Sequence, residues 1–98
     1  MMNDIPSASI NLSVRLFGLR GKDAGMNLLP KTVQLGSSVQ DIWSSLQKKA
    51  DPDEMLATVP SEAILVLVNG SPIEYSNGWE TILNDGDEVT FMLKTSGG

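Results

Sequence analysis

Apolar and polar residues alternate along several short segments of this chain, with the period of two that is typical of strands with one buried face. The apolar positions of this kind are Ile10, Leu12, Val14 and Leu16, then Val33 and Leu35 within residues 31–35, and finally Val89, Phe91 and Leu93. A further segment, Ala63–Val68, is apolar throughout and rich in β-branched residues, which indicates a central strand. Residues 18–30 contain three glycines and mixed charges without a period, and predict a connection.

The pattern changes to a helical one after Gly36. Ser38 is suited to cap a helix whose first turn contains Asp41, where the helix dipole favours a negative charge. The apolar positions then recur at spacings of three and four residues, at Val39, Ile42, Trp43 and Leu46. Lys48 and Lys49 are favourable at the C-terminal end. We therefore predict one amphipathic helix.

Shorter signals complete the predicted order of elements. Asp51–Glu54 resembles a helix start with proline at the first helical position, and predicts a short helical turn that carries Met55 and Leu56. Asn69-Gly70 predicts a tight hairpin turn with a returning strand at 73–75. Trp79, Ile82 and Leu83 have helical spacing and predict a short turn before the last strand.

These elements predict an α+β fold in which one main helix packs across a mixed sheet of about five strands. The 98 residues suffice for one hydrophobic core, so we expect a single domain over residues 1–98 with residues 95–98 as a flexible tail. Hydrophobic residues make up 41% of the chain, which is typical of a globular protein.

Charge and composition exclude several classes of function. The net charge of −5 disfavours nucleic acid and anionic membranes as partners, and basic protein surfaces are favoured instead. Cysteine and histidine are absent, which excludes disulfides, thiolate nucleophiles and histidine-based catalysis. The longest apolar segment is too short to span a membrane, and we expect a cytoplasmic protein without a cofactor.

Two acidic clusters, at residues 51–54 and 85–88, invite a metal hypothesis, but neither has the spacing of a calcium loop. Both occur where turns and helix caps use carboxylates, so we predict a structural role. The serines have no histidine to activate them. Trp43 and Phe91 are predicted to belong to the core.

The remaining candidate is the Gly97-Gly98 terminus. Two residues without side chains can extend into a narrow channel and present the Gly98 carboxylate to the active site of another protein. The doublet alone fits this reactive tip and a frayed chain end equally well.

Several segments, taken in order, resemble the ubiquitin-like sulfur carriers of the MoaD and ThiS type, which have the β-grasp fold. The resemblance covers residues 12–98: Leu12–Arg20 is similar to the family's first strand, Val68-Asn69-Gly70 to its hairpin, and Leu83–Val89 followed by Gly97-Gly98 to its closing block. The Leu19-Arg20 pair and the long connection after the first strand favour the MoaD branch.

The resemblance implies a carrier and not an enzyme. A partner of the ubiquitin-activating type would adenylate Gly98 with ATP, and a sulfurtransferase would convert the adenylate to a thiocarboxylate. In the MoaD branch the acceptor is the large subunit of molybdopterin synthase, in molybdenum cofactor biosynthesis. The residues expected to contact partners are Phe17, Leu65, Leu67, Met92 and Lys94.

Of these partner contacts, Leu65, Leu67 and Met92 are predicted from alternation to point away from the helix and to form an exposed apolar patch. Coverage by the segment 18–30 is the alternative for that patch. Three alternatives for the function also remain open: a protein modifier that uses the same activated terminus, a sulfur carrier for a thiamine-type pathway, and a noncovalent interaction module with an inert tail.

Overall fold

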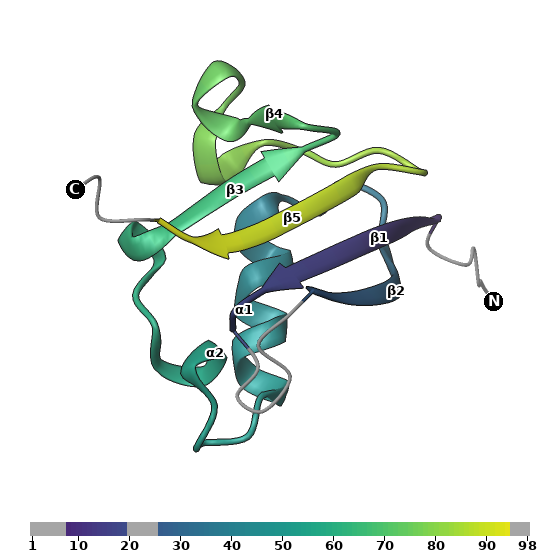
Figure 1. Cartoon of the computed structure of the whole chain (residues 1–98). Coiled ribbons are helices and arrows are strands. Elements are labelled where there is room, and N and C mark those ends of the chain that lie inside the picture. Colours follow the sequence, from purple (N-terminus) through teal and green to yellow (C-terminus); the bar gives the residue numbers. More distant parts are fainter. Residues whose placement is uncertain (1–7, 20–25, 95–98) are drawn as a thin grey trace, which may run out of the picture.

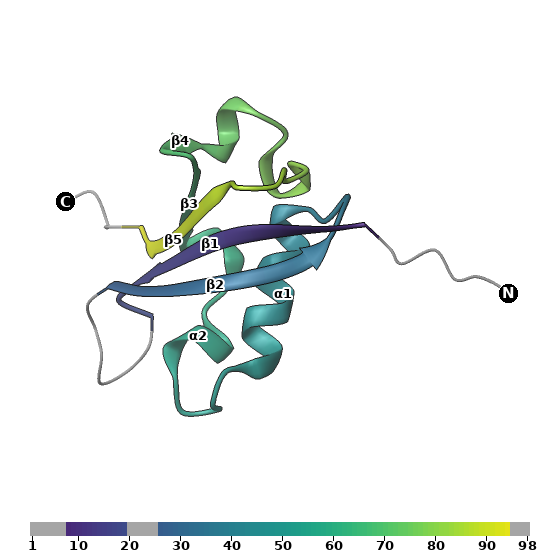
Figure 2. The same ribbon diagram turned by 90° about the vertical axis from the view of Figure 1, so that its right-hand side faces the viewer.

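A computed structural model describes residues 8–19 and 26–94 of the chain. Its strands are β1 (Ser9–Phe17), β2 (Met26–Gln34), β3 (Ile64–Val68), β4 (Ser71–Pro72) and β5 (Glu88–Leu93), and its helices are α1 (Val39–Lys49) and α2 (Met55–Thr58). The strands form one sheet in the order β2-β1-β5-β3-β4, in which only β1 and β5 are parallel. Helix α1 crosses one face of this sheet, and no helix within residues 8–19 and 26–94 covers the opposite face, which we call the open face (Figures 1 and 2).

The core lies between α1 and the sheet and contains the predicted apolar positions of β1, β3, β5 and the helix. Val14, Leu16, Val39, Val89 and Phe91 are fully buried, and Ile42, Trp43 and Val66 almost so. The rings of Trp43 and Phe91 pack with their centroids 5.1 Å apart, which confirms that both are core residues. Complete burial of one such side chain contributes about 1.5–3 kcal/mol to the free energy of folding.

Helix α1 begins with the predicted cap. The Ser38 hydroxyl accepts a hydrogen bond from the Asp41 N–H at 3.1 Å, and the Asp41 carboxylate accepts one from the Ser38 N–H at 2.9 Å. Two N–H groups that the helix itself cannot satisfy are thereby paired. Lys48 and Lys49 lie in the last turn, where their positive charges interact favourably with the negative end of the helix dipole.

Strand β2 begins five residues earlier than the predicted Lys31 and contains Pro30. The Leu35 N–H donates to the Ala8 carbonyl, and N–H groups alternate in direction along a strand, so position 30 points its nitrogen away from β1. Proline therefore removes no bond from the ladder there. The prediction of a buried Leu35 was wrong, because Leu35 lies beyond the end of β2 and is 62% exposed.

Two smaller predictions were also wrong. The returning strand at 73–75 is a 3₁₀ turn, because Pro72 has no N–H to continue pairing and the turn directs Ile73 into the core. The predicted helical turn does carry Met55 and Leu56, as α2, but the predicted start at residues 51–54 was wrong, because the helix begins at Met55. No helix within the described residues is long and apolar enough to cross a membrane.

Candidate functional site

The open face of the sheet carries an apolar cluster near the end of β5. In the strand register Met92 lies opposite Phe17 on one side and opposite Leu65 on the other, so these three residues form a row across three strands. Directly opposed residues project from the same face. Leu67 adjoins the row on β3, and all four side chains are partly exposed. We call Phe17, Leu65, Leu67 and Met92 the open-face cluster.

The position of this cluster follows from alternation along two strands. On β3 the buried residues Ile64 and Val66 alternate with Leu65 and Leu67, and on β5 the buried Phe91 precedes Met92. Because successive side chains of a strand project from opposite faces, the neighbours of core residues must project from the open face. Alternation predicted this orientation for Leu65, Leu67 and Met92, and the strand register confirms it. The alternative, coverage by the segment 18–30, falls partly on residues that lie outside the described ones.

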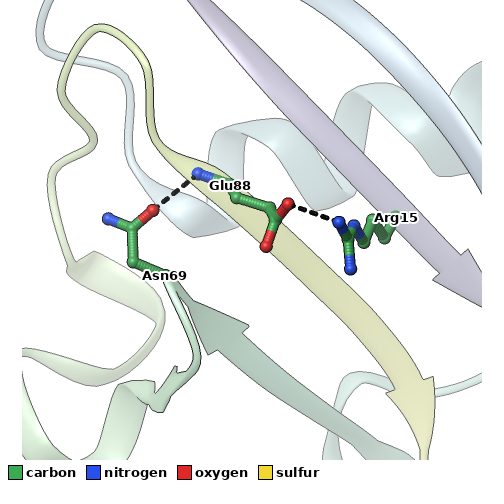
Figure 3. Close-up of polar contacts among 3 residues, drawn as sticks. All are labelled: Arg15, Asn69 and Glu88. Carbon is green, nitrogen blue, oxygen red and sulfur yellow. Dashed lines mark hydrogen bonds and ion pairs between the residues drawn. The ribbon is translucent and has the colours of Figure 1, made fainter.

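A polar group borders the cluster on β1 and β5. Arg15 and Glu88 form an ion pair of 2.8 Å on the open face, and the Glu88 N–H donates to the Asn69 side-chain oxygen at 2.9 Å (Figure 3). Asn69, at φ 52°, also donates its own N–H to the Glu88 carbonyl at 2.7 Å. Thr90, which lies opposite Arg15, is 7% exposed. The β3–β4 turn is thus fixed to the start of β5.

Sequence reasoning missed this polar group. Asn69 was predicted only as a turn residue, and nothing in the sequence pairs Arg15 with Glu88. The pair exists because β1 and β5 are parallel neighbours, with Ser13 opposite Glu88 and Arg15 opposite Thr90. The available signal was that Arg15 and Glu88 each occupy a polar position of an alternating strand. This signal becomes informative only once β1 and β5 are known to be neighbours.

The end of β5 is anchored next to the cluster. The Lys94 N–H donates to the Ala63 carbonyl at 2.9 Å, so the chain is held against the start of β3 as far as Lys94. Lys94 is exposed and lies two residues beyond Met92. The predicted reactive residues Gly97 and Gly98 lie outside the described residues, as does the predicted tail at 95–98.

The two acidic clusters serve the backbone, as predicted. In the first, Glu54 accepts a hydrogen bond from the Asp51 N–H at 3.3 Å. In the second, Asp85 accepts one from the Asn11 N–H at 2.7 Å and Asp87 one from the Asn84 N–H at 2.8 Å. Within residues 8–19 and 26–94, no three His, Cys, Asp or Glu side chains are grouped so that they could hold a metal ion.

The candidate site is therefore an apolar surface patch beside the end of β5. Its residues offer van der Waals contact and one charged pair, and such surfaces on small proteins typically bind another protein. Met92 adds adaptability, because its unbranched thioether side chain packs against differently shaped partners.

Comparison with known proteins relates the chain to a family and to several solved structures. Residues 28–98 match the sequence profile of the ThiS family. The solution structure of the Haloferax volcanii HVO 2177 protein is similar with a TM-score of 0.76 and 25% identity, over 99% of this chain and 94% of that one. No curated protein sequence matches significantly.

Two further solution structures share the fold. The small archaeal modifier protein 1 from Methanosarcina acetivorans has a TM-score of 0.66 and 28% identity, over 93% of this chain and 99% of that one. Urm1 from Trypanosoma brucei has a TM-score of 0.62 and 24% identity, over 95% of this chain and 100% of that one. The predicted β-grasp, ubiquitin-like fold is confirmed.

Proposed function

The chain belongs to the ThiS family, and on this premise we propose that it is a sulfur carrier that acts through the carboxylate of Gly98. Members of this family are small ubiquitin-like carrier proteins. The observation that carries the proposal is that the open-face cluster lies beside the anchored end of β5, from which the chain continues towards Gly98. A partner that docks on the cluster is therefore placed close to the start of the tail.

The proposed chemistry takes place in two steps on the terminal acyl group. A carboxylate oxygen of Gly98 attacks the α-phosphate of ATP, which releases pyrophosphate and leaves an acyl adenylate. A sulfide ion (HS−) supplied by the donor then attacks the acyl carbon, the bond to the AMP oxygen breaks and AMP leaves, which produces a thiocarboxylate. The chain contributes the substrate group, while the activating enzyme supplies the catalytic residues and the magnesium-bound nucleotide.

We further propose that the activating enzyme binds the open-face cluster together with Lys94. The cluster supplies the buried apolar centre that protein interfaces require, and the Lys94 ammonium at its margin pairs with an acidic group of the partner. The net charge of −5 favours basic surfaces elsewhere on that partner.

For the acceptor we propose the large subunit of molybdopterin synthase. Support comes from the Leu19-Arg20 pair, which resembles that of MoaD-type carriers. The long connection after the first strand no longer contributes, because β2 starts at Met26 and only residues 18–25 separate it from β1. A thiamine-type acceptor uses the same activated terminus and is distinguished by testing the two acceptor enzymes in parallel.

A second candidate function is protein modification. The 28% identity over 93% of the chain to a protein named as a small archaeal modifier favours it. The activation step is the same, but the adenylated Gly98 would be transferred to a lysine amine of a target instead of to sulfur.

The decisive experiment is intact-mass spectrometry after incubation with ATP, an adenylating enzyme of the ubiquitin-activating type and a sulfur source. We expect the mass increase of one oxygen replaced by sulfur, located at Gly98. A chain that lacks Gly97 and Gly98 should remain unchanged, while the control Thr95→Ala, which alters the tail but keeps the doublet, should be modified normally. An unmodified wild-type chain would contradict the carrier function, and Gly98 joined to target lysines would favour the modifier.

A further inference from the structure

A pocket of about 240 Å³ lies between β2, α1 and α2, on the helix side of the sheet and therefore away from the open-face cluster. Apolar side chains from four elements, β1, β2, α1 and α2, form much of its wall, namely Leu16, Leu29, Leu46 and Leu56. Two lysines, Lys31 on β2 and Lys49 on α1, line it as well. Two ammonium groups around one apolar pocket are unexpected in a chain with a net charge of −5.

Lys31 differs from the other described lysines in its surroundings. It lies opposite the buried Leu12 in the register of β1 and β2, so its side chain projects from the covered face of the sheet. Its Nζ donates to the Ser45 hydroxyl of α1 at 3.5 Å, and the residue is partly buried. Lys48, Lys49 and Lys94 are exposed.

The electrostatics of the pocket favour the neutral form of this amine. Burial, and next the neighbouring Lys49 ammonium, lower the pKa of Lys31 below its usual value. Glu54 also lines the pocket, where its carboxylate is held by the Asp51 N–H, but the net direction for the pKa of Lys31 is downward. An apolar environment and an adjacent cation are the two conditions that activate lysine as a nucleophile.

We propose that Lys31 is a nucleophilic lysine and the preferred site at which this chain is acylated by activated carboxyl groups. The reagent class comprises active esters and acyl anhydrides, to which an acyl adenylate belongs. The neutral Nζ attacks the acyl carbon, a C–N bond forms, the bond to the leaving oxygen breaks, and the amine proton passes to solvent. If the proposed function holds, the adenylated Gly98 of a second copy is one such reagent.

The first test needs no partner protein. The folded chain is treated with a limiting amount of N-hydroxysuccinimidyl acetate, a neutral active ester, over a range of pH, and acetylation of each lysine is followed by peptide mass spectrometry. At neutral pH Lys31 should react roughly threefold or more faster than Lys48 and Lys94, because burial and the Lys49 ammonium lower the pKa of Lys31 and so favour its nucleophilic, neutral form. The rate of Lys31 acetylation should also reach its plateau at a lower pH than that of an ordinary lysine amine.

Two matched variants test whether Lys31 reacts fast because its amine is activated or only because it is accessible to the reagent. Lys49→Gln removes the neighbouring charge and should slow acetylation of Lys31 by roughly half or more, with its pH profile moved upward. Lys48→Gln removes an equal charge one residue away, on a side chain that does not line the pocket, and should leave Lys31 unchanged. Equal rates at all lysines, or equal effects of the two variants, would overturn the proposal.

A second test joins the inference to the proposed function. With ATP and the adenylating enzyme but no sulfur donor, Gly98 of one copy should become linked to Lys31 of another, and Lys31→Arg should abolish this product whereas Lys48→Arg should not. Pyrophosphate release with conjugates spread over other lysines would overturn the assignment of Lys31. Absence of pyrophosphate release would contradict the proposed function, and the ester experiment would still decide the reactivity of Lys31.

Discussion

The two faces of the sheet use the same strands for different purposes. On the covered face, the side chains of Val14, Val89 and Phe91 are fully buried against α1. On the open face, Leu65 on β3 and Met92 on β5 are also apolar, yet both remain partly exposed. These side chains therefore contribute less to stability than those of the covered face. The difference supports the proposed docking of a partner on the open face.

The largest effect should come from the covered face. Phe91→Ala removes a fully buried ring that packs against Trp43 and Trp79, and we expect it to lower the free energy of unfolding by about 3–5 kcal/mol. Urea unfolding followed by circular dichroism measures the change. Met92→Ala, one residue along the same strand, is the matched control and should lose about 1 kcal/mol, in line with its partial exposure. Similar losses for both would refute the division between the faces.

A smaller effect, on binding instead of stability, should come from the open face. Met92→Asp places a charge in the centre of the open-face cluster, and we expect the affinity for the activating enzyme to fall by roughly 30-fold, equivalent to about 2 kcal/mol. Titration calorimetry with the enzyme gives the dissociation constant. Thr32→Asp adds the same charge to an exposed position of β2 and should bind normally. Unchanged binding of Met92→Asp would place the docking surface elsewhere.

The smallest effect should come from the ion pair at the border of the cluster. Arg15 and Glu88 are 39% and 38% exposed, so solvent screens their attraction, and Arg15→Gln should cost at most about 1 kcal/mol of stability. A double-mutant cycle with Glu88→Gln, repeated at high salt, isolates the pair. A coupling energy well above this value that persists in salt would show that the pair behaves as a buried one.

Local patterns predicted the elements whose residues contact the core directly. Alternation identified β1 and β5, and Ser38 with Asp41 identified the start of α1, because caps and periodic burial depend on near neighbours in sequence. The start of β2 was missed because residues 18–30, with three glycines, mixed charges and no period, indicated a connection. Pro30 is tolerated within β2 because its nitrogen points to the free edge, which depends on the pairing partner.

The candidate site also contains some residues that local sequence patterns predict and others that depend on the packing of distant segments. Leu65, Leu67 and Met92 followed from alternation along single strands, whereas the Arg15–Glu88 pair required the parallel contact of β1 with β5. The pocket around Lys31 required four elements to meet, which no single segment encodes. Lys31 itself occurs at a core-facing position of an alternating segment, and this was the one signal that was available in the sequence.

The central place of β5 has a consequence for biosynthesis. This strand is the last of the five to be translated, yet it lies between β1 and β3. A nascent chain that ends before residue 88 therefore has no strand to join its first hairpin to its third strand, and contacts so distant in sequence form slowly. Phe17, Leu65 and Met92 meet only when that strand enters, so an incomplete chain lacks the open-face cluster that we propose as the docking surface.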